Sequence, residues 1–354
     1  MEKIISKQSV PEWVKKLEDY TIFAPVNRED HWSFEVIENP DVIDLGYLNT
    51  TPSPKKAVFP PREVFFEFYG AESGNEPGQM EIKETLPEEK PQIIFGIRPC
   101  DAKAIALIDK VFAGDFNDPY YLKRRETTIL VGLGCAKPPS DNCFCTSVGG
   151  SPHGKTGLDI LVTDLGDDYY LESLTPGGVK IMDFSGELFR EPGTEERGKA
   201  AKIHESAPGK IKREINDVEK SCNRLGESNM FASPLWEEEA KACIRCGICT
   251  YLCPSCHCFD MSDEVERISP LKGKRVRTWD NCQFPDFTMH SSGHNPRPDK
   301  AARLRRRVLH KYPYFVRTNG DYLCTGCGRC VTNCPVGIDI IEILNRAERL
   351  NDNE

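Results

Sequence analysis

The sequence predicts an α/β domain with a mainly parallel sheet over residues 1–190, followed by an all-α domain over residues 233–354. Three observations support this division. Nearly continuous apolar segments alternate with a helical pattern between residues 93 and 163, as in proteins built from βαβ units. Residues 191–232 are polar and charged, which predicts a helical linker. The last third of the chain carries one cysteine pattern twice.

Three strands are expected in the first part of this domain. These segments are residues 21–26, 32–37 and 64–69. Three further segments are apolar almost throughout, which is typical of parallel strands buried on both faces: residues 93–98, 127–133 and 158–163. Apolar residues with helical spacing follow the first of these, so residues 102–112 are expected to form a helix.

Four cysteines of this domain stand close to the ends of its predicted buried strands. Cys100 follows the strand at 93–98, Cys135 follows the strand at 127–133, and Cys143 and Cys145 come shortly afterwards. Open parallel sheets bind ligands at the carboxyl ends of their strands. We therefore expect the four to converge and to hold a third iron–sulfur cluster. A zinc site or four reduced, buried thiols are the alternatives.

The second domain contains two runs with the spacing C-x2-C-x2-C-x3-C, each followed by proline. This spacing is typical of bacterial ferredoxins that hold two [4Fe–4S] clusters, in which the fourth cysteine of each run ligates the other cluster. We therefore assign one cluster to Cys243, Cys246, Cys249 and Cys334. The other is assigned to Cys324, Cys327, Cys330 and Cys253. Structural zinc is the alternative to this assignment.

The rest of the second domain is expected to be helical, which makes it an all-α, ferredoxin-like dicluster domain. The predicted helices are residues 234–243, 262–268, 286–291, 298–312 and 339–350. The basic run from Arg303 to Lys311 either forms a solvated face, offsets the charge of a cluster or docks an acidic partner. Spacing assigns no role to the remaining cysteines: Cys222, Cys256, Cys258 and Cys282.

Composition restricts the class of protein. The net charge of −9 argues against nucleic-acid binding, which needs a basic face. No apolar run approaches the length that spans a bilayer, and the first residues lack a signal-peptide core. The chain is therefore expected in the cytoplasm. There, sixteen cysteines are expected to bind metal rather than to form disulfides.

Several motifs together resemble one family. They are residues 95–101 (FGIRPCD), 142–147 (NCFCTS), 253–259 (CPSCHCF), 279–282 (WDNC), 293–298 (GHNPRP) and 324–330 (CTGCGRC). This combination resembles the beta subunit of cytosolic sulfhydrogenases and the related iron–sulfur subunit of anaerobic sulfite reductases. The likeness extends from about Lys55 to Ile340.

The resemblance implies an iron–sulfur electron carrier within an oxidoreductase complex. Family members pass electrons between two partners: a flavin- and NAD(P)H-binding subunit, and a catalytic subunit that is either a nickel–iron hydrogenase or a sirohaem reductase. No nucleophile–base pair stands out, so catalysis by this chain alone is not expected. The alternatives are a first domain that itself binds a flavin or a substrate and is catalytic, and a zinc-stabilised scaffold.

Overall fold

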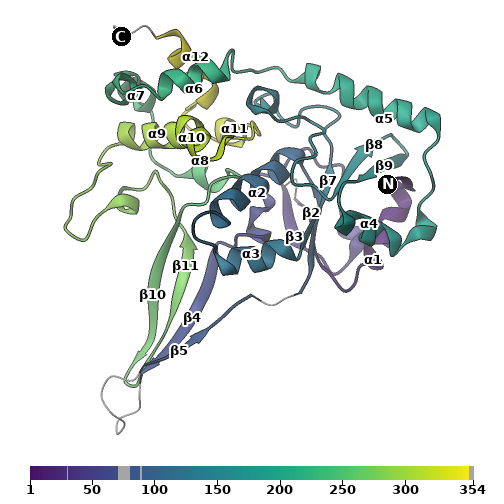
Figure 1. Cartoon of the computed structure of the whole chain (residues 1–354), viewed down its shortest axis with the longest axis horizontal. Helices are drawn as coiled ribbons and strands as arrows, with labels where there is room; N and C mark the ends of the chain where they lie inside the picture. Colours follow the sequence, from purple (N-terminus) through teal and green to yellow (C-terminus); the bar gives the residue numbers. More distant parts are fainter. Residues whose placement is uncertain (30, 71–79, 88–89, 351–354) are drawn as a thin grey trace.

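The computed structural model describes residues 1–29, 31–70, 80–87 and 90–350. They form an α/β body, a helical lobe beside it and a four-stranded sheet that projects away from both (Figure 1). No helix in these ranges is long and apolar enough to cross a membrane.

A seven-stranded sheet forms the body, with the order β1-β9-β8-β7-β6-β2-β3. The strands are β1 (Glu2–Ser6), β2 (Thr21–Arg28), β3 (His31–Val36), β6 (Gln92–Ile97), β7 (Thr128–Leu133), β8 (Ile160–Asp164) and β9 (Asp168–Ser173). Its four central strands are parallel, and every residue of β6 is buried, as the apolar runs predicted. The outer pairings are antiparallel, so the sheet is mixed rather than mainly parallel.

Short helices surround this sheet. They are α1 (Val10–Lys15), α2 (Pro99–Phe112), α3 (Pro119–Glu126) and α4 (Pro176–Asp183). The predicted linker segment contains two helices with different surroundings. Helix α5 (Thr194–Ser206) runs along the outside of the body, where Ala200 packs near Ile4 (Figure 1). Helix α6 (Val218–Leu225) belongs to the helical lobe and packs on α12 (Ile340–Arg349).

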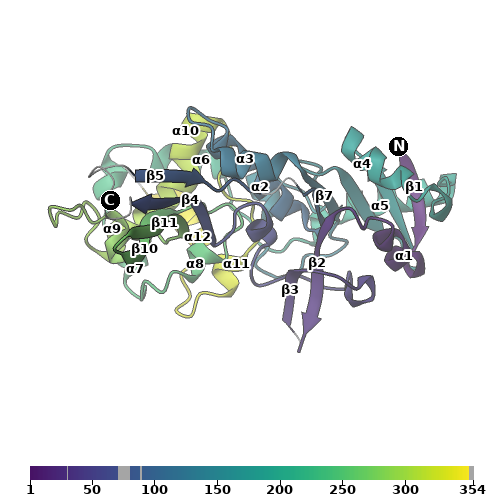
Figure 2. The same cartoon turned by 90° about the horizontal axis from the view of Figure 1, so that it is seen from below.

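The helical lobe has its own apolar core, which includes Trp236, Leu304, Tyr312 and Ile343. Its remaining helices are α7 (Leu235–Ala240), α8 (Ile248–Tyr251), α9 (Lys300–Leu309), α10 (Phe315–Asn319) and α11 (Arg329–Thr332). A π-helical turn, His310–Tyr314, continues α9 into α10. Figure 2 shows this lobe at the opposite end of the molecule from β1 and α4.

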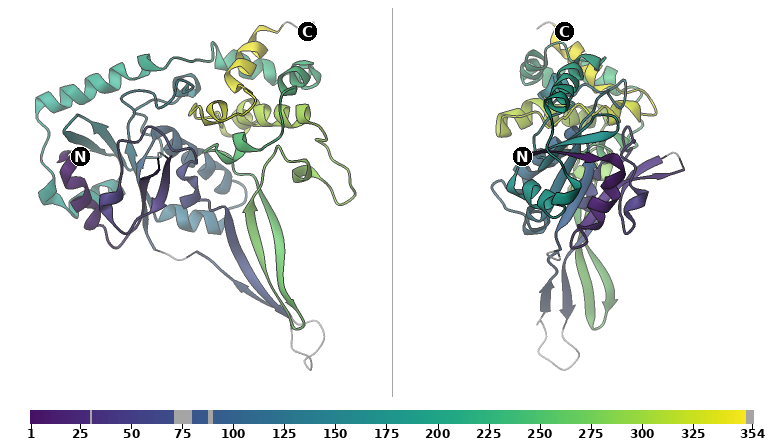
Figure 3. Two further views of the ribbon diagram at one scale, coloured as in Figure 1. Left: turned by 180° about the vertical axis from the view of Figure 1, so that it is seen from behind. Right: turned by 90° about the vertical axis from the view of Figure 1, so that its right-hand side faces the viewer.

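The prediction of an all-α second domain is wrong for residues 259–279, which form two strands. The helix predicted at 286–291 is only a short 3-10 turn, Pro285–Thr288. Residues 262–268, expected as a helix, lie in β10 (Phe259–Ile268), which forms a hairpin with β11 (Leu271–Trp279). This hairpin pairs with β4 (Arg62–Gly70) and β5 (Met80–Glu84), so the strand predicted at 64–69 lies in this second sheet (Figure 3). The physical reason is cross-strand pairing: Asp263 on β10 accepts two 2.7 Å hydrogen bonds from Arg275 on β11.

Candidate metal centres

The two cysteine runs fold into the same turn. Gly247 and Gly328 both adopt left-handed backbone conformations, with φ of 79° and 73°, directly before α8 and α11. Two residues earlier in each run, Arg245 and Gly326 also have positive φ, 56° and 66°. In both turns the glycine carbonyl accepts a hydrogen bond from the N–H three residues later. The donor is Thr250 at 2.9 Å in the first run and Val331 at 3.0 Å in the second. The sequence repeat is therefore a structural repeat.

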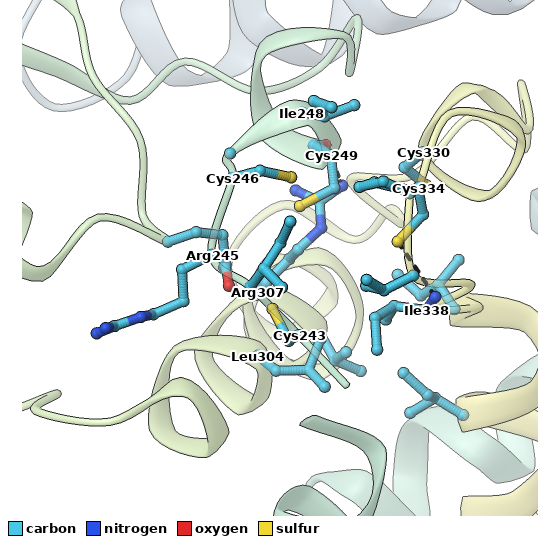
Figure 4. A pocket seen from close by; sticks show the side chains of 18 residues that line it. Cys243, Arg245, Cys246, Ile248, Cys249, Leu304, Arg307, Cys330, Cys334 and Ile338 are labelled. Atoms are coloured by element: carbon cyan, nitrogen blue, oxygen red, sulfur yellow. Dashed lines mark hydrogen bonds between the residues drawn. The ribbon is translucent and has the colours of Figure 1, made fainter. Parts of the chain in front are cut away.

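The first three cysteines of the earlier run surround a cavity together with the last cysteine of the later run. Figure 4 shows Cys243, Cys246 and Cys249 on one side and Cys334 on the other. The Ile338 N–H donates a 3.2 Å hydrogen bond to the Cys334 sulfur. Cys330 also lines this cavity. The structure thus brings together the four cysteines that spacing assigns to one cluster.

The other four cysteines of the runs form a second, more deeply buried group, and their thiols are close enough to perturb one another. They are Cys253, Cys324, Cys327 and Cys330. Burial raises the pKa of Cys327 to about 12, with a further contribution from Cys253. Hydrogen bonding to Cys256, together with nearby cations, instead holds the pKa of Cys253 well below its usual range.

The four cysteines of the first domain line a third cavity, as expected. Cys100 lies in the first turn of α2, and Cys135 lies just past β7. Cys143 lies in the loop before the 3-10 turn Cys145–Val148, and Cys145 is the first residue of that turn. Both line the cavity. Burial raises the pKa of the Cys145 thiol to about 12 and that of Cys100 well above its usual value. Thiolates here need positive charge beside them.

The second group and the third cavity are in direct contact. Cys327 and Gly326 line the third cavity. The Phe144 N–H donates a 2.8 Å hydrogen bond to the Gly326 carbonyl. A Cβ atom at Gly326 would lie 2.4 Å from the Cys145 Cα, so only glycine permits this approach. The two domains therefore meet at their cysteine loops.

A buried ion pair joins the domains at the same place. Arg329, next to Cys330, donates two hydrogen bonds of 2.6 and 2.8 Å to Asp101, next to Cys100. Both side chains are almost wholly buried, with 2% and 1% of their surfaces exposed. A bidentate arginine–carboxylate pair fixes orientation as well as distance. It therefore holds the third cavity and the second group in one arrangement.

Comparisons with known proteins identify the second domain and the family of the chain. Residues 242–338 match the family model of a 4Fe-4S dicluster domain. The chain is 30% identical to sulfhydrogenase 2 subunit beta of Pyrococcus furiosus over 340 residues, which is 95% of each chain. The chain belongs to the sulfhydrogenase beta-subunit family. The family predicted from the sequence motifs is thus confirmed, and this family member contains an iron–sulfur domain.

Four buried cations lie beside the cysteine groups of this beta-subunit family member: Lys55, Arg98, Arg307 and Lys311. In the described part of the chain none has a carboxylate within salt-bridge distance; each donates hydrogen bonds to backbone carbonyls. An unpaired buried charge costs several kcal/mol. An anionic group in the cavities would remove that cost, and a four-thiolate cubane is such a group. The residues present therefore fit iron–sulfur clusters.

The contacts of these cations show which cysteine group each one lies beside. Lys55 bonds the carbonyls of Cys253 and Cys256 at 3.0 and 2.8 Å. Lys311 lies 3.1 Å from the Ser255 hydroxyl oxygen. Burial by itself would lower the pKa of Lys311, but the thiols of Cys253 and Cys256 raise it above its usual value. Both ammonium groups therefore face the second group.

The guanidinium groups of the other two cations lie at the remaining sites. Arg307 lines the first cavity and donates a 3.4 Å hydrogen bond to the Cys256 sulfur. Arg98 lines the third cavity, stacks 4.3 Å from the Tyr47 ring centre and bonds the Gly134 carbonyl at 3.1 Å. The basic run in the sequence includes Arg307 and Lys311. It gave no signal for Lys55, which is distant in sequence.

The cysteines left unassigned by spacing lie in two places. Cys222 is buried in the core of the helical lobe. Cys256, Cys258 and Cys282 lie near the cysteine runs, with Cys258 and Cys282 at the base of the β10–β11 hairpin. Within the described ranges, no three Cys, His, Asp or Glu side chains are grouped as a site for a single metal ion.

Proposed function

We propose that this chain is the electron-transfer subunit of a hydrogenase- or sulfite-reductase-type complex. It relays electrons between two partners: a flavin- and NAD(P)H-binding subunit, and a catalytic redox subunit. The observation that carries this proposal is the succession of three cysteine-lined sites across the junction of the two domains. A succession of redox centres suits long-range electron transfer, because clusters carry single electrons.

In this proposal each site holds one [4Fe–4S] cluster. The first cluster has the ligands Cys243, Cys246, Cys249 and Cys334. The second has the ligands Cys253, Cys324, Cys327 and Cys330. The third has the ligands Cys100, Cys135, Cys143 and Cys145. Cys327 borders the third cavity and Cys330 borders the first, so the second cluster stands between the other two.

The clusters supply one-electron chemistry, and the chain's own residues set the conditions for it. Partial burial of the second and third sites limits their contact with water, which lowers the local dielectric constant and strengthens charge interactions. The unpaired ammonium and guanidinium groups of Lys55, Lys311, Arg307 and Arg98 stabilise added negative charge. The Arg329–Asp101 pair keeps the spacing between the second and third sites fixed.

The partner assignment is tested by isolation of the complex. A tagged chain would be purified anaerobically from its native source, and the associated chains would be identified by mass spectrometry. We expect one flavoprotein and one catalytic metalloprotein, and bleaching of the chain's visible absorption when NADH or NADPH is added. Isolation of a chain that itself binds flavin, without partners, would contradict the proposal.

The third cluster is tested by substitution. In the reconstituted full chain, Cys100→Ser should lower the iron content by about four per chain, because a cubane with a missing ligand is readily lost. The control Cys222→Ser removes a thiol from the apolar core of the helical lobe and should leave the iron content unchanged. Equal iron contents in the two variants would restrict the chain to two clusters.

A further inference from the structure

Two cysteines outside the three proposed cluster sites lie side by side. Cys258 directly precedes β10 and Cys282 follows β11, so the hairpin brings them together: the Asp280 N–H donates a 3.0 Å hydrogen bond to the Cys258 carbonyl. The two thiols lie close enough for each to shift the pKa of the other. Both are partly exposed, whereas Cys256 near them is buried.

The Cys282 sulfur has polar neighbours that suit a thiolate. The Gln283 side-chain amide donates to it at 3.4 Å, and the Thr250 hydroxyl lies 3.5 Å away. The hydrogen bond from Cys258 is the largest influence that lowers the pKa of Cys282, and the Arg307 guanidinium lowers it further. The same contact raises the pKa of Cys258 above its usual range. These contacts therefore favour ionisation of Cys282 over that of Cys258.

The pair also lies next to the first proposed cluster site. Thr250, whose hydroxyl contacts Cys282, directly follows the proposed ligand Cys249. The neighbouring residue Gln283 lines the same cavity as Cys249. Electrons therefore have a short path between this thiol pair and the first cluster.

From this geometry we propose that Cys258 and Cys282 form a redox-active dithiol that exchanges two electrons with the clusters. On oxidation, one thiol and one thiolate lose two electrons and one proton, and one S–S bond forms. The electrons pass singly to oxidised clusters of the same chain, which supply the oxidant; the reverse process reopens the disulfide. The inference rests on the proposed electron-transfer function. It adds a two-electron store to a chain of one-electron carriers.

The test maps these thiols in the reconstituted full chain under anaerobic conditions. One sample is reduced with dithionite and another is oxidised with thionin; each is unfolded in iodoacetamide and digested. We expect both cysteines to be alkylated after reduction and to be joined in one cross-linked peptide pair after oxidation. The link should disappear in Cys258→Ser and in Cys282→Ser, and persist in Cys256→Ser, whose thiol lies in the same peptide.

A second measurement keeps the inference separate from the proposed function. Coulometric reduction of the oxidised protein should consume two electrons more per chain in the wild type than in Cys258→Ser. Alkylation of both cysteines in the oxidised wild type would overturn the inference. So would a loss of about four irons per chain in either serine variant, because the residue would then be a cluster ligand. Failure of the electron-transfer function would appear differently, as a wild-type chain without iron.

Discussion

Lys311→Met tests whether a buried cation sets the potential of the second proposed cluster. The Lys311 ammonium lies 3.1 Å from the Ser255 hydroxyl and 3.0 Å from the carbonyl of Leu323, which directly precedes Cys324. For a charge about 7 Å from the added electron, Coulomb's law with an effective dielectric constant of about 20 would give about 2 kcal/mol. For one electron this corresponds to about 100 mV.

The direction of the shift in reduction potential follows from the positive charge of Lys311. Reduction adds a negative charge that Lys311 stabilises, so its removal should lower the reduction potential. The assay is a redox titration of the reconstituted chain followed by electron paramagnetic resonance. Lys311→Arg keeps the charge and should shift the potential much less. Arg317→Met removes an exposed charge from the next helix and serves as the control. A reduction potential for Lys311→Met equal to that of Arg317→Met would show that Lys311 does not set the potential of the second proposed cluster.

Three further predictions follow from the geometry. Cys253→Ser should damage chiefly the cluster of the later run and Cys334→Ser that of the earlier run, as resolved by Mössbauer spectroscopy; loss of each run's own cluster would disprove the shared ligation. Asp101→Asn should destabilise the chain by about 3–5 kcal/mol in urea unfolding, because it leaves the Arg329 charge buried without its partner; an unchanged midpoint would contradict this. Gly326→Ala should weaken cluster retention, measured as iron per chain, because its Cβ has no space and its φ is positive; wild-type iron content would argue against the close approach.

Much of the arrangement could be predicted because the relevant signals are local. Buried parallel strands show themselves as continuous apolar runs, and β6 and β7 lie within one residue of the predicted ranges. The cysteines after those strands, Cys100 and Cys135, meet at one cavity because parallel strands end at the same edge. The pairing of Cys334 with the earlier run remains a prediction, supported by its position on the first cavity.

Other features depend on contacts between distant segments. Residues 259–268 are rich in acidic side chains and have weak strand propensity of their own, but pairing with β11 makes them a strand. Lys55 contacts carbonyls 198 and 201 residues away, and no local pattern marks it. The Arg329–Asp101 pair spans 228 residues. The sequence thus shows the cysteine groups but not the charges that surround them.

The proposed function depends on three iron–sulfur clusters in succession within this one chain. The most direct measurement is Mössbauer spectroscopy with iron and sulfide analysis on the full chain, reconstituted anaerobically and reduced. We expect about twelve irons per chain, all in cubane clusters. A colourless protein that retains zinc and gives no cluster signal after reduction would contradict it.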